Sequence, residues 1–183
     1  MRMIATIIAA LYYALPGLFA NMAPVIFRNR FSWLAKPVDL GKRLGDKPIA
    51  GSHKTFRGFV TGIGLAILIA WFQRILFLDG FFLSISFLDY AQVNIILFGS
   101  LMGFGALFGD LVKSIIKRRL KKRPGERFFP WDQLDFVIGI IIFSSIIKPM
   151  TPGMMAALLI AVPLLTIVVN HTAYLFKIRD EKW

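Results

Sequence analysis

Five apolar segments run through the chain, and they limit the folds it can adopt more than any other feature. A helix needs about 20 mostly apolar residues to cross a bilayer, and only the fourth segment is clearly shorter. The predicted spans cover about 3–27, 58–78, 92–112, 133–148 and 153–176. The composition agrees, because 57% of the residues are hydrophobic and only 17% are charged. The sequence therefore predicts an all-α integral membrane protein, with a bundle of five transmembrane helices forming a single domain over residues 1–183.

Lysine and arginine are concentrated in alternate connections between these spans. Residues 28–57 contain eight of them and residues 113–127 contain another eight, whereas residues 79–91 contain none. Basic loops are usually retained on the cytoplasmic side of a membrane. We therefore expect the N-terminus outside the cell, and the C-terminus and both basic loops, 28–57 and 113–132, in the cytoplasm. This pattern predicts a multi-pass protein of the cell membrane.

The net charge of +12 is gathered in these few blocks. Such blocks suit the lipid bilayer surface, phosphorylated substrates or nucleic acid. Nucleic acid is disfavoured, because no nucleic-acid-binding motif accompanies the charge. The chain has no cysteine, which excludes disulfides, cysteine-based zinc sites and a thiol nucleophile. The apolar run at the N-terminus is too long for the core of a signal peptide, so we expect a retained first span.

Three aspartates lie at the predicted cytoplasmic edge of the third and fourth spans. Asp110 lies near the end of one span, while Asp132 and Asp135 are one helical turn apart at the start of the next. Carboxylates this close repel one another unless a cation neutralises them, and hard oxygen ligands suit Mg²⁺. The sequence therefore predicts a Mg²⁺ site formed by these three residues. The alternative is that Asp132 caps its helix and Asp135 complements the positive end of that helix.

Basic and hydroxyl side chains surround these acids in both loops. If the third span continues as a helix beyond residue 112, one polar face carries Asp110, Ser114, Lys117 and Lys121. The segment GSHKTFRG, residues 51–58, has glycines around cations and a threonine, a combination that can hold phosphate oxygens, although it lacks the Walker pattern. The alternative for the basic run is membrane topology and attraction to anionic lipid.

Other residues carry expectations that concern the fold. Glycines four residues apart predict close helix packing, with ordinary tolerance of glycine in membrane helices as the alternative; they are Gly58 and Gly62, Gly99 and Gly103, and Gly105 and Gly109. Pro124-Gly125 predicts a turn back towards the membrane. Asp39 and Asp46 are predicted to be loop acids, with Asp39 joining the other carboxylates as the alternative.

The combination of these motifs resembles a known family. Gly109-Asp110-Leu111, Ser114-x-x-Lys117-Arg118 and Asp132-x-x-Asp135 are similar to the signature of CTP-dependent cytidylyltransferases that make CDP-activated lipids. Further similarities indicate the CDP-archaeol synthase branch; they are Asn21-Met-Ala-Pro24, Lys54-Thr-Phe-Arg57-Gly58, KRRL and Asp132-Gln-Leu-Asp135-Phe136. The chain departs from CDP-diacylglycerol synthases, which have a Lys-Asp pair and a His-Gly-Gly element where this chain has Lys122-Arg123 and Phe129-Pro130-Trp131.

The resemblance implies a reaction and roles for individual residues. CTP and a membrane lipid phosphate, such as 2,3-bis-O-geranylgeranyl-glycerol 1-phosphate, would give a CDP-lipid and pyrophosphate, with Mg²⁺ as cofactor. The catalytic residues implied are Asp110, Asp132, Asp135 and Lys117, with the three aspartates as metal ligands. The substrate-binding residues implied are Lys54, Thr55, Arg57, Gly58, Lys113, Ser114, Arg118, Arg119, Lys122 and Asn21. The active site would then lie at the cytoplasmic face.

Several alternatives remain at this point. The lipid could be phosphatidic acid, as for a CDP-diacylglycerol synthase. A transporter would need charged residues near the middle of the bilayer, whereas Arg74 and Lys148 lie near the predicted outer boundary. A membrane adaptor without activity would tolerate replacement of the three aspartates. The sequence leaves open whether the chain forms a homo-oligomer.

Overall fold

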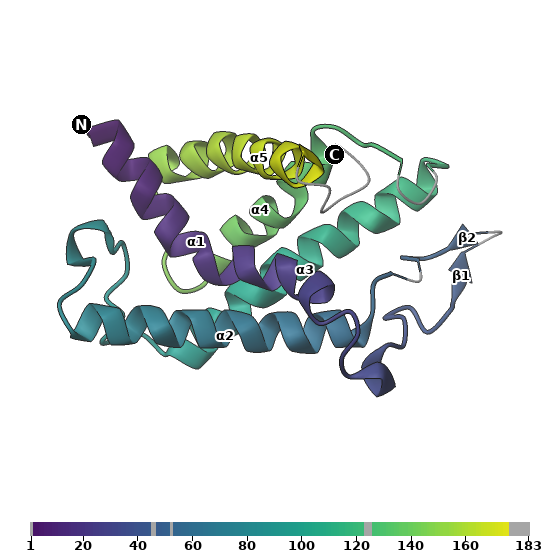
Figure 1. Cartoon of the computed structure of the whole chain (residues 1–183), viewed down its shortest axis with the longest axis horizontal. Helices are drawn as coiled ribbons and strands as arrows, with labels where there is room; N and C mark the ends of the chain where they lie inside the picture. The colour runs from purple at the N-terminus through teal and green to yellow at the C-terminus, as the bar shows by residue number, and fades with distance from the viewer. Residues whose placement is uncertain (1, 45–46, 52, 123–125, 176–183) are drawn as a thin grey trace.

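A computed structural model describes residues 2–44, 47–51, 53–122 and 126–175. The predicted turn at Pro124-Gly125, Asp46 and the C-terminal tail lie outside these ranges. Within them, five α-helices account for most of the chain (Figure 1); they are α1 (Arg2–Ile26), α2 (Phe56–Leu78), α3 (Ile95–Arg119), α4 (Trp131–Ser144) and α5 (Pro152–Leu175). A small antiparallel hairpin, β1 (Arg43–Leu44) and β2 (Lys47–Pro48), lies in the loop between α1 and α2. The predicted all-α architecture with five helices is confirmed.

Three of these helices are long and apolar enough to cross a membrane. They are α1 from Met3 to Ile26, all of α2 and all of α3, and α5 adds a shorter apolar stretch from Pro152 to Val168. The prolines at positions 16, 24 and 163 lie inside continuous helices.

The fourth helix is shorter than its predicted bounds of 133–148. It begins two residues earlier and ends at Ser144. Its 14 residues span about 21 Å, less than the roughly 30 Å hydrocarbon core. Beyond Ser144 the backbone N–H groups of Ile146 and Ile147 donate to carbonyls three residues back, those of Phe143 and Ser144. The chain therefore leaves the α-helical pattern before the apolar run is complete.

Two other helices begin at side-chain caps. The Thr55 hydroxyl accepts a hydrogen bond from the backbone N–H of Gly58 at 3.2 Å, so α2 starts at residue 56. The Asn94 side chain accepts from the N–H of Leu97 at 3.0 Å, so α3 starts at residue 95 rather than 92. Each cap satisfies an N–H group that would otherwise be free at the helix start.

Glycines hold α3 close to its neighbours on two sides, as their spacing predicts. A Cβ at Gly99 would lie 2.6 Å from the Cα of Ile67 in α2, and Gly103 faces the same helix. A Cβ at Gly105 would lie 2.6 Å from the carbonyl oxygen of Gly139 in α4, and one at Gly109 would overlap the carbonyl oxygen of Asp135. The backbones of α3 and α4 therefore touch where Asp110 meets Asp135.

The core of the bundle is apolar and aromatic. Tyr13, Phe98, Met102, Ile140 and Leu158 are all fully buried, and they come from α1, α3, α4 and α5. Many other long apolar side chains of α2 and α3 are exposed, among them Leu68, Phe72, Ile96 and Ile116, as expected for surfaces that face lipid. This packing fixes the C-terminal end of α3 against the start of α4, on the same side of the bundle as the hairpin (Figure 1).

Candidate active site

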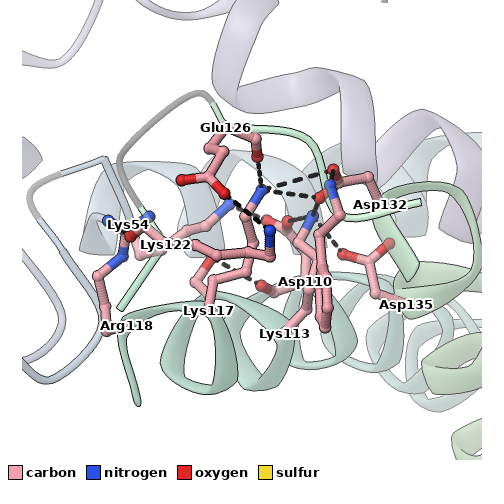
Figure 2. A network of polar contacts seen from close by, with 11 residues as sticks. Lys54, Asp110, Lys113, Lys117, Arg118, Lys122, Glu126, Asp132 and Asp135 are labelled. Atoms are coloured by element: carbon pink, nitrogen blue, oxygen red, sulfur yellow. Dashed lines mark hydrogen bonds and ion pairs between the residues drawn. The ribbon is translucent and has the colours of Figure 1, made fainter. Parts of the chain in front are cut away.

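The last turns of α3 and the first turn of α4 bring three carboxylates around one ammonium group. The Nζ atom of Lys113 lies 3.1 Å from Asp110 Oδ1, 3.4 Å from Asp132 Oδ1 and 2.8 Å from Asp135 Oδ2. Figure 2 shows these contacts, and we call the three aspartates the carboxylate cluster. Asp135 is the most buried of the three, with a side chain that is 3% exposed. The structure thus brings together the three acids that the sequence singled out.

Two further lysines contact the edges of the carboxylate cluster. Lys54, from the loop before α2, pairs with Asp110. Lys117 is buried and lies 3.1 Å from Asp132 Oδ1, and it also donates to the carbonyl oxygen of Glu126. Both basic loops therefore contribute a cation to the same group of acids, although they are more than 50 residues apart in sequence.

Asp132 also fixes the chain that leads into α4. Its Oδ2 atom accepts a hydrogen bond from the N–H of Phe128 at 2.6 Å. Burial alone would raise the pKa of this carboxyl, but the Phe128 N–H and the ammonium groups of Lys117 and Lys113 outweigh it and hold the pKa below its ordinary value. Asp132 is therefore ionised at neutral pH. The alternative of an N-cap role does not hold, because Pro130 occupies that position.

The predicted polar face of α3 is only partly correct. Helix α3 ends at Arg119, and Lys121 has a positive φ of 61°, so Lys121 does not continue the face. The Ser114 hydroxyl donates to the carbonyl of Asp110 at 2.9 Å and is thus turned towards its own helix. Lys113, which is not on the predicted face, lies at the centre of the carboxylate cluster instead. Its spacing of three residues from Asp110 is a known pairing distance on helices, and this signal was available in the sequence.

Several residues expected to bind substrate have structural partners. Thr55 caps α2, and a Cβ at Gly58 would lie 3.3 Å from Pro24 of α1. Arg57 donates to the carbonyl of Arg30 at 3.3 Å. Asn21 is half-buried in α1 and forms no side-chain hydrogen bond with another residue of the described ranges.

The second basic loop shows the same mixture of roles. Arg118 donates to the carbonyl of Lys122 at 2.9 Å, and Lys122 pairs with Glu126 at 2.7 Å. Arg119 donates to the carbonyl oxygens of Leu44 and Pro48, both at 2.9 Å. Arg119 thereby ties the hairpin to the end of α3. Sequence reasoning missed this link, since a two-residue hairpin has no strong pattern.

Asp39 organises the first loop and does not join the carboxylate cluster. Its carboxylate accepts hydrogen bonds from the N–H groups of Gly41 at 3.0 Å, Ala50 at 2.9 Å and Gly51 at 3.3 Å. The slight burial of this group favours a higher pKa, but the three N–H donors lower it. The prediction of a loop acid is confirmed, and this turn helps to place Lys54 beside Asp110.

The carboxylate cluster supplies the ligand type that a divalent ion needs. Within the described ranges, no three His, Cys, Asp or Glu side chains are arranged as a finished coordination shell. The reason is visible in the contacts, because the Lys113 ammonium lies among the three carboxylates. The acids are therefore assembled at one place but spaced around an ammonium group rather than a metal ion.

Comparison with known proteins assigns the whole chain to one family. A family model described as "CarS-like: CDP-archaeol synthase" matches residues 3–183. The chain belongs to this family. The predicted enzyme class, a CTP-dependent cytidylyltransferase of archaeal lipid synthesis that uses an ether lipid phosphate, is thereby confirmed.

Relatives in this family match almost end to end. The CDP-archaeol synthases of Thermococcus gammatolerans and Methanocaldococcus jannaschii are each 35% identical, over 95% and 96% of both chains. The CDP-archaeol synthase of Pyrococcus furiosus is also 35% identical, over 97% of this chain and 98% of its own. A solved structure of an intramembrane enzyme for archaeal membrane lipid biosynthesis has a TM-score of 0.70 and 28% identity, covering 88% of this chain and 92% of its own. The chain is thus a multi-pass intramembrane enzyme of the CDP-archaeol synthase family.

Proposed function

We propose that the chain makes CDP-archaeol from CTP and an ether lipid phosphate at the carboxylate cluster, and that its full length forms one catalytic domain. The approach of all three aspartates to a single nitrogen atom, at 3.4 Å or less, carries this proposal. An oxygen of the lipid phosphate attacks the α-phosphorus of CTP, and the bond to pyrophosphate breaks. Because this step brings two anions together, positioning and charge neutralisation account for most of the catalysis.

The carboxylate cluster fits Mg²⁺ in its donor chemistry. All three side chains offer hard oxygen atoms, and Asp135 Oδ1 is buried with no hydrogen-bond partner in the described ranges. A buried carboxylate oxygen without a donor is costly, so a cation is the natural partner. Asp110, Asp132 and Asp135 would hold the ion. When bound, Mg²⁺ neutralises CTP phosphates and stabilises the pyrophosphate leaving group.

The surrounding cations suit the phosphates of both substrates. Lys54, from the loop before α2, and Lys117, from the last turn of α3, flank the carboxylate cluster and would bind phosphate oxygens beside it. Arg118 and Lys122 would bind the outer phosphates. No general base is required, since a lipid phosphate is already ionised at neutral pH.

The other predicted substrate residues fall into two groups, those that would contact substrate and those that support the fold. Arg57 and Asn21 remain candidates for contacts to the lipid from the side of α1 and α2. Thr55, Gly58, Ser114 and Arg119 act through the fold instead, because their polar groups or backbones already contact protein atoms.

A direct assay tests the proposed activity. We expect purified protein in detergent, given CTP, Mg²⁺ and an archaeal isoprenoid-ether phosphate, to release pyrophosphate, with slower release from a diacyl phosphate of matched head group. Measured release with neither lipid, from protein shown to be folded by its unfolding transition, would reject the proposed function. Faster release with the diacyl lipid would reject the proposed ether-lipid preference.

The active site is proposed to face the cytoplasm, with the N-terminus outside. The charge distribution supports this orientation. Because the chain has no cysteine, single cysteines at Ser32, in the first basic loop, and at Ser84, in the opposite connection, give unambiguous labels. In intact cells we expect a membrane-impermeant maleimide to label S84C but not S32C until the membrane is permeabilised. The reverse pattern would place the active site outside.

A further inference from the structure

Lys113 differs from the other cations of the active site in the number of acids it contacts. Among the residues that the structure describes, Lys54 forms an ion pair with Asp110 alone, and Lys117 with Asp132 alone. Lys113 contacts all three members of the carboxylate cluster, and its side chain is only 16% exposed. An ammonium group has three N–H donors, so it can offer one to each carboxylate.

The position of this ammonium coincides with the point where a metal ion bound to the same acids would have to lie. Lys113 Nζ is 2.8–3.4 Å from the three oxygens, whereas a Mg–O bond is about 2.1 Å. The carboxylates would therefore each have to move inward by about 1 Å around Mg²⁺. Two cations cannot occupy this point together, since they repel strongly at such distances in a partly buried site.

We propose that Lys113 is an internal counter-cation that holds the carboxylate cluster together before metal binds, and that a divalent ion must displace its ammonium group. This inference rests on the proposed function. The stem of Lys113 is flexible, so the released ammonium can turn to a substrate phosphate oxygen. Metal alone then binds weakly, because it gains three ligands only by breaking three ion pairs. Metal and CTP bind with positive coupling, because CTP gives the displaced ammonium a new partner.

Binding of Mn²⁺, measured by electron paramagnetic resonance without CTP or lipid, tests this proposal independently of turnover. We expect Lys113→Met to bind Mn²⁺ roughly tenfold or more tightly than wild type. Lys117→Met is the matched control, since it removes the same charge from a lysine that contacts one carboxylate. The inference requires a clearly smaller gain for Lys117→Met. Equal gains, or no gain for Lys113→Met, would overturn it.

The coupling between nucleotide binding and Mn²⁺ binding gives a second measurement. In wild type we expect a non-hydrolysable CTP analogue to tighten Mn²⁺ binding by roughly tenfold, and in Lys113→Met we expect most of that coupling to disappear. Coupling that is unchanged by the substitution would contradict the proposal. If wild type and both variants bind no Mn²⁺ even with the analogue, the metal site of the proposed function fails as well.

A measurement on wild type avoids any dependence on a variant that folds poorly. An amine-acetylating reagent followed by mass spectrometry reports the accessibility of Lys113, with Lys122 as an internal reference because its ion pair with Glu126 lies away from the carboxylate cluster. We expect Mn²⁺ to increase acetylation of Lys113 several-fold relative to Lys122. No increase at a Mn²⁺ concentration that saturates the resonance signal would overturn the proposal.

Discussion

Gly109→Ala is expected to remove nearly all turnover and to lower the stability of the protein. A Cβ at this position would overlap the carbonyl oxygen of Asp135, which belongs to the backbone of α4 and cannot rotate away. The two helices must therefore separate, and Asp110 moves with α3 away from Asp135. A misplacement of about 1 Å can cost about a hundredfold in rate, and overpacking costs about 1–3 kcal/mol in the free energy of unfolding. Pyrophosphate release and thermal unfolding in detergent measure the two effects.

Gly64→Ala is the matched control for this substitution. Gly64 lies in α2, is exposed, and has no atom within 4 Å of the position its Cβ would take. We expect turnover close to wild type and a change in unfolding free energy within about 1 kcal/mol, the difference in helix propensity between glycine and alanine. Normal turnover in Gly109→Ala would show that contact between α3 and α4 does not set the geometry of the carboxylate cluster.

Asp132→Asn is expected to reduce turnover by about a thousandfold or more while the protein remains folded. The amide has the size of the carboxyl group and its oxygen can still accept the hydrogen bond from Phe128, so the start of α4 is retained. The charge is lost, and with it the attraction to Lys117, Lys113 and the proposed metal ion. Steady-state kinetics over a range of Mg²⁺ concentrations separates weaker metal binding from slower chemistry.

The control is Asp89→Asn, at the other end of the bundle. Asp89 accepts a hydrogen bond from the N–H of Ala91 at 3.0 Å and has no contact with the carboxylate cluster. We expect its turnover to match wild type. Near-normal turnover in Asp132→Asn would instead limit Asp132 to holding the loop before α4.

The pH dependence of stability should distinguish Asp132→Asn from wild type in a defined direction. The pKa of Asp132 is lowered in the folded protein, so the ionised carboxylate stabilises the fold at any pH above its ordinary value, about 3.9. That contribution is lost as the pH falls through the lower, folded-state pKa. The difference in stability between the two proteins should therefore be constant from pH 7 to about pH 5 and shrink below about pH 4.

The helices could be predicted because they depend on residue patterns within each segment of the sequence. Apolar runs identify the spans, and the glycine pairs identify the faces where helices touch, since backbone contact in lipid needs small residues. The exact ends depend on single hydrogen bonds, as the caps at Thr55 and Asn94 show. A hydropathy pattern cannot contain those effects, because it averages over many residues.

The site was predictable in its acids and less so in its cations. Few arrangements place Asp110, Asp132 and Asp135 near a membrane boundary without bringing them together. Lysine and arginine, by contrast, are numerous in both loops, and a count of charges does not tell which long side chain turns inward. Lys113 was predicted to bind substrate, yet it lies at the centre of the acids. Arg119 contacts the hairpin through backbone carbonyls. Every residue has such a carbonyl, so the sequence does not indicate which ones accept the hydrogen bonds.

Helix α3 carries its contacts to α2, its contacts to α4 and the first acid of the carboxylate cluster within one continuous stretch from Gly99 to Asp110. One inserted or deleted residue inside this stretch would rotate all later residues of the helix by about 100° relative to the earlier ones. The stretch therefore cannot change in length, whereas a loop can. Chimeras between distant members of the family should therefore exchange α3 and α4 as one block. Crossover points belong in the connection from Asp79 to Asn94, where a change in length is absorbed before the helix begins.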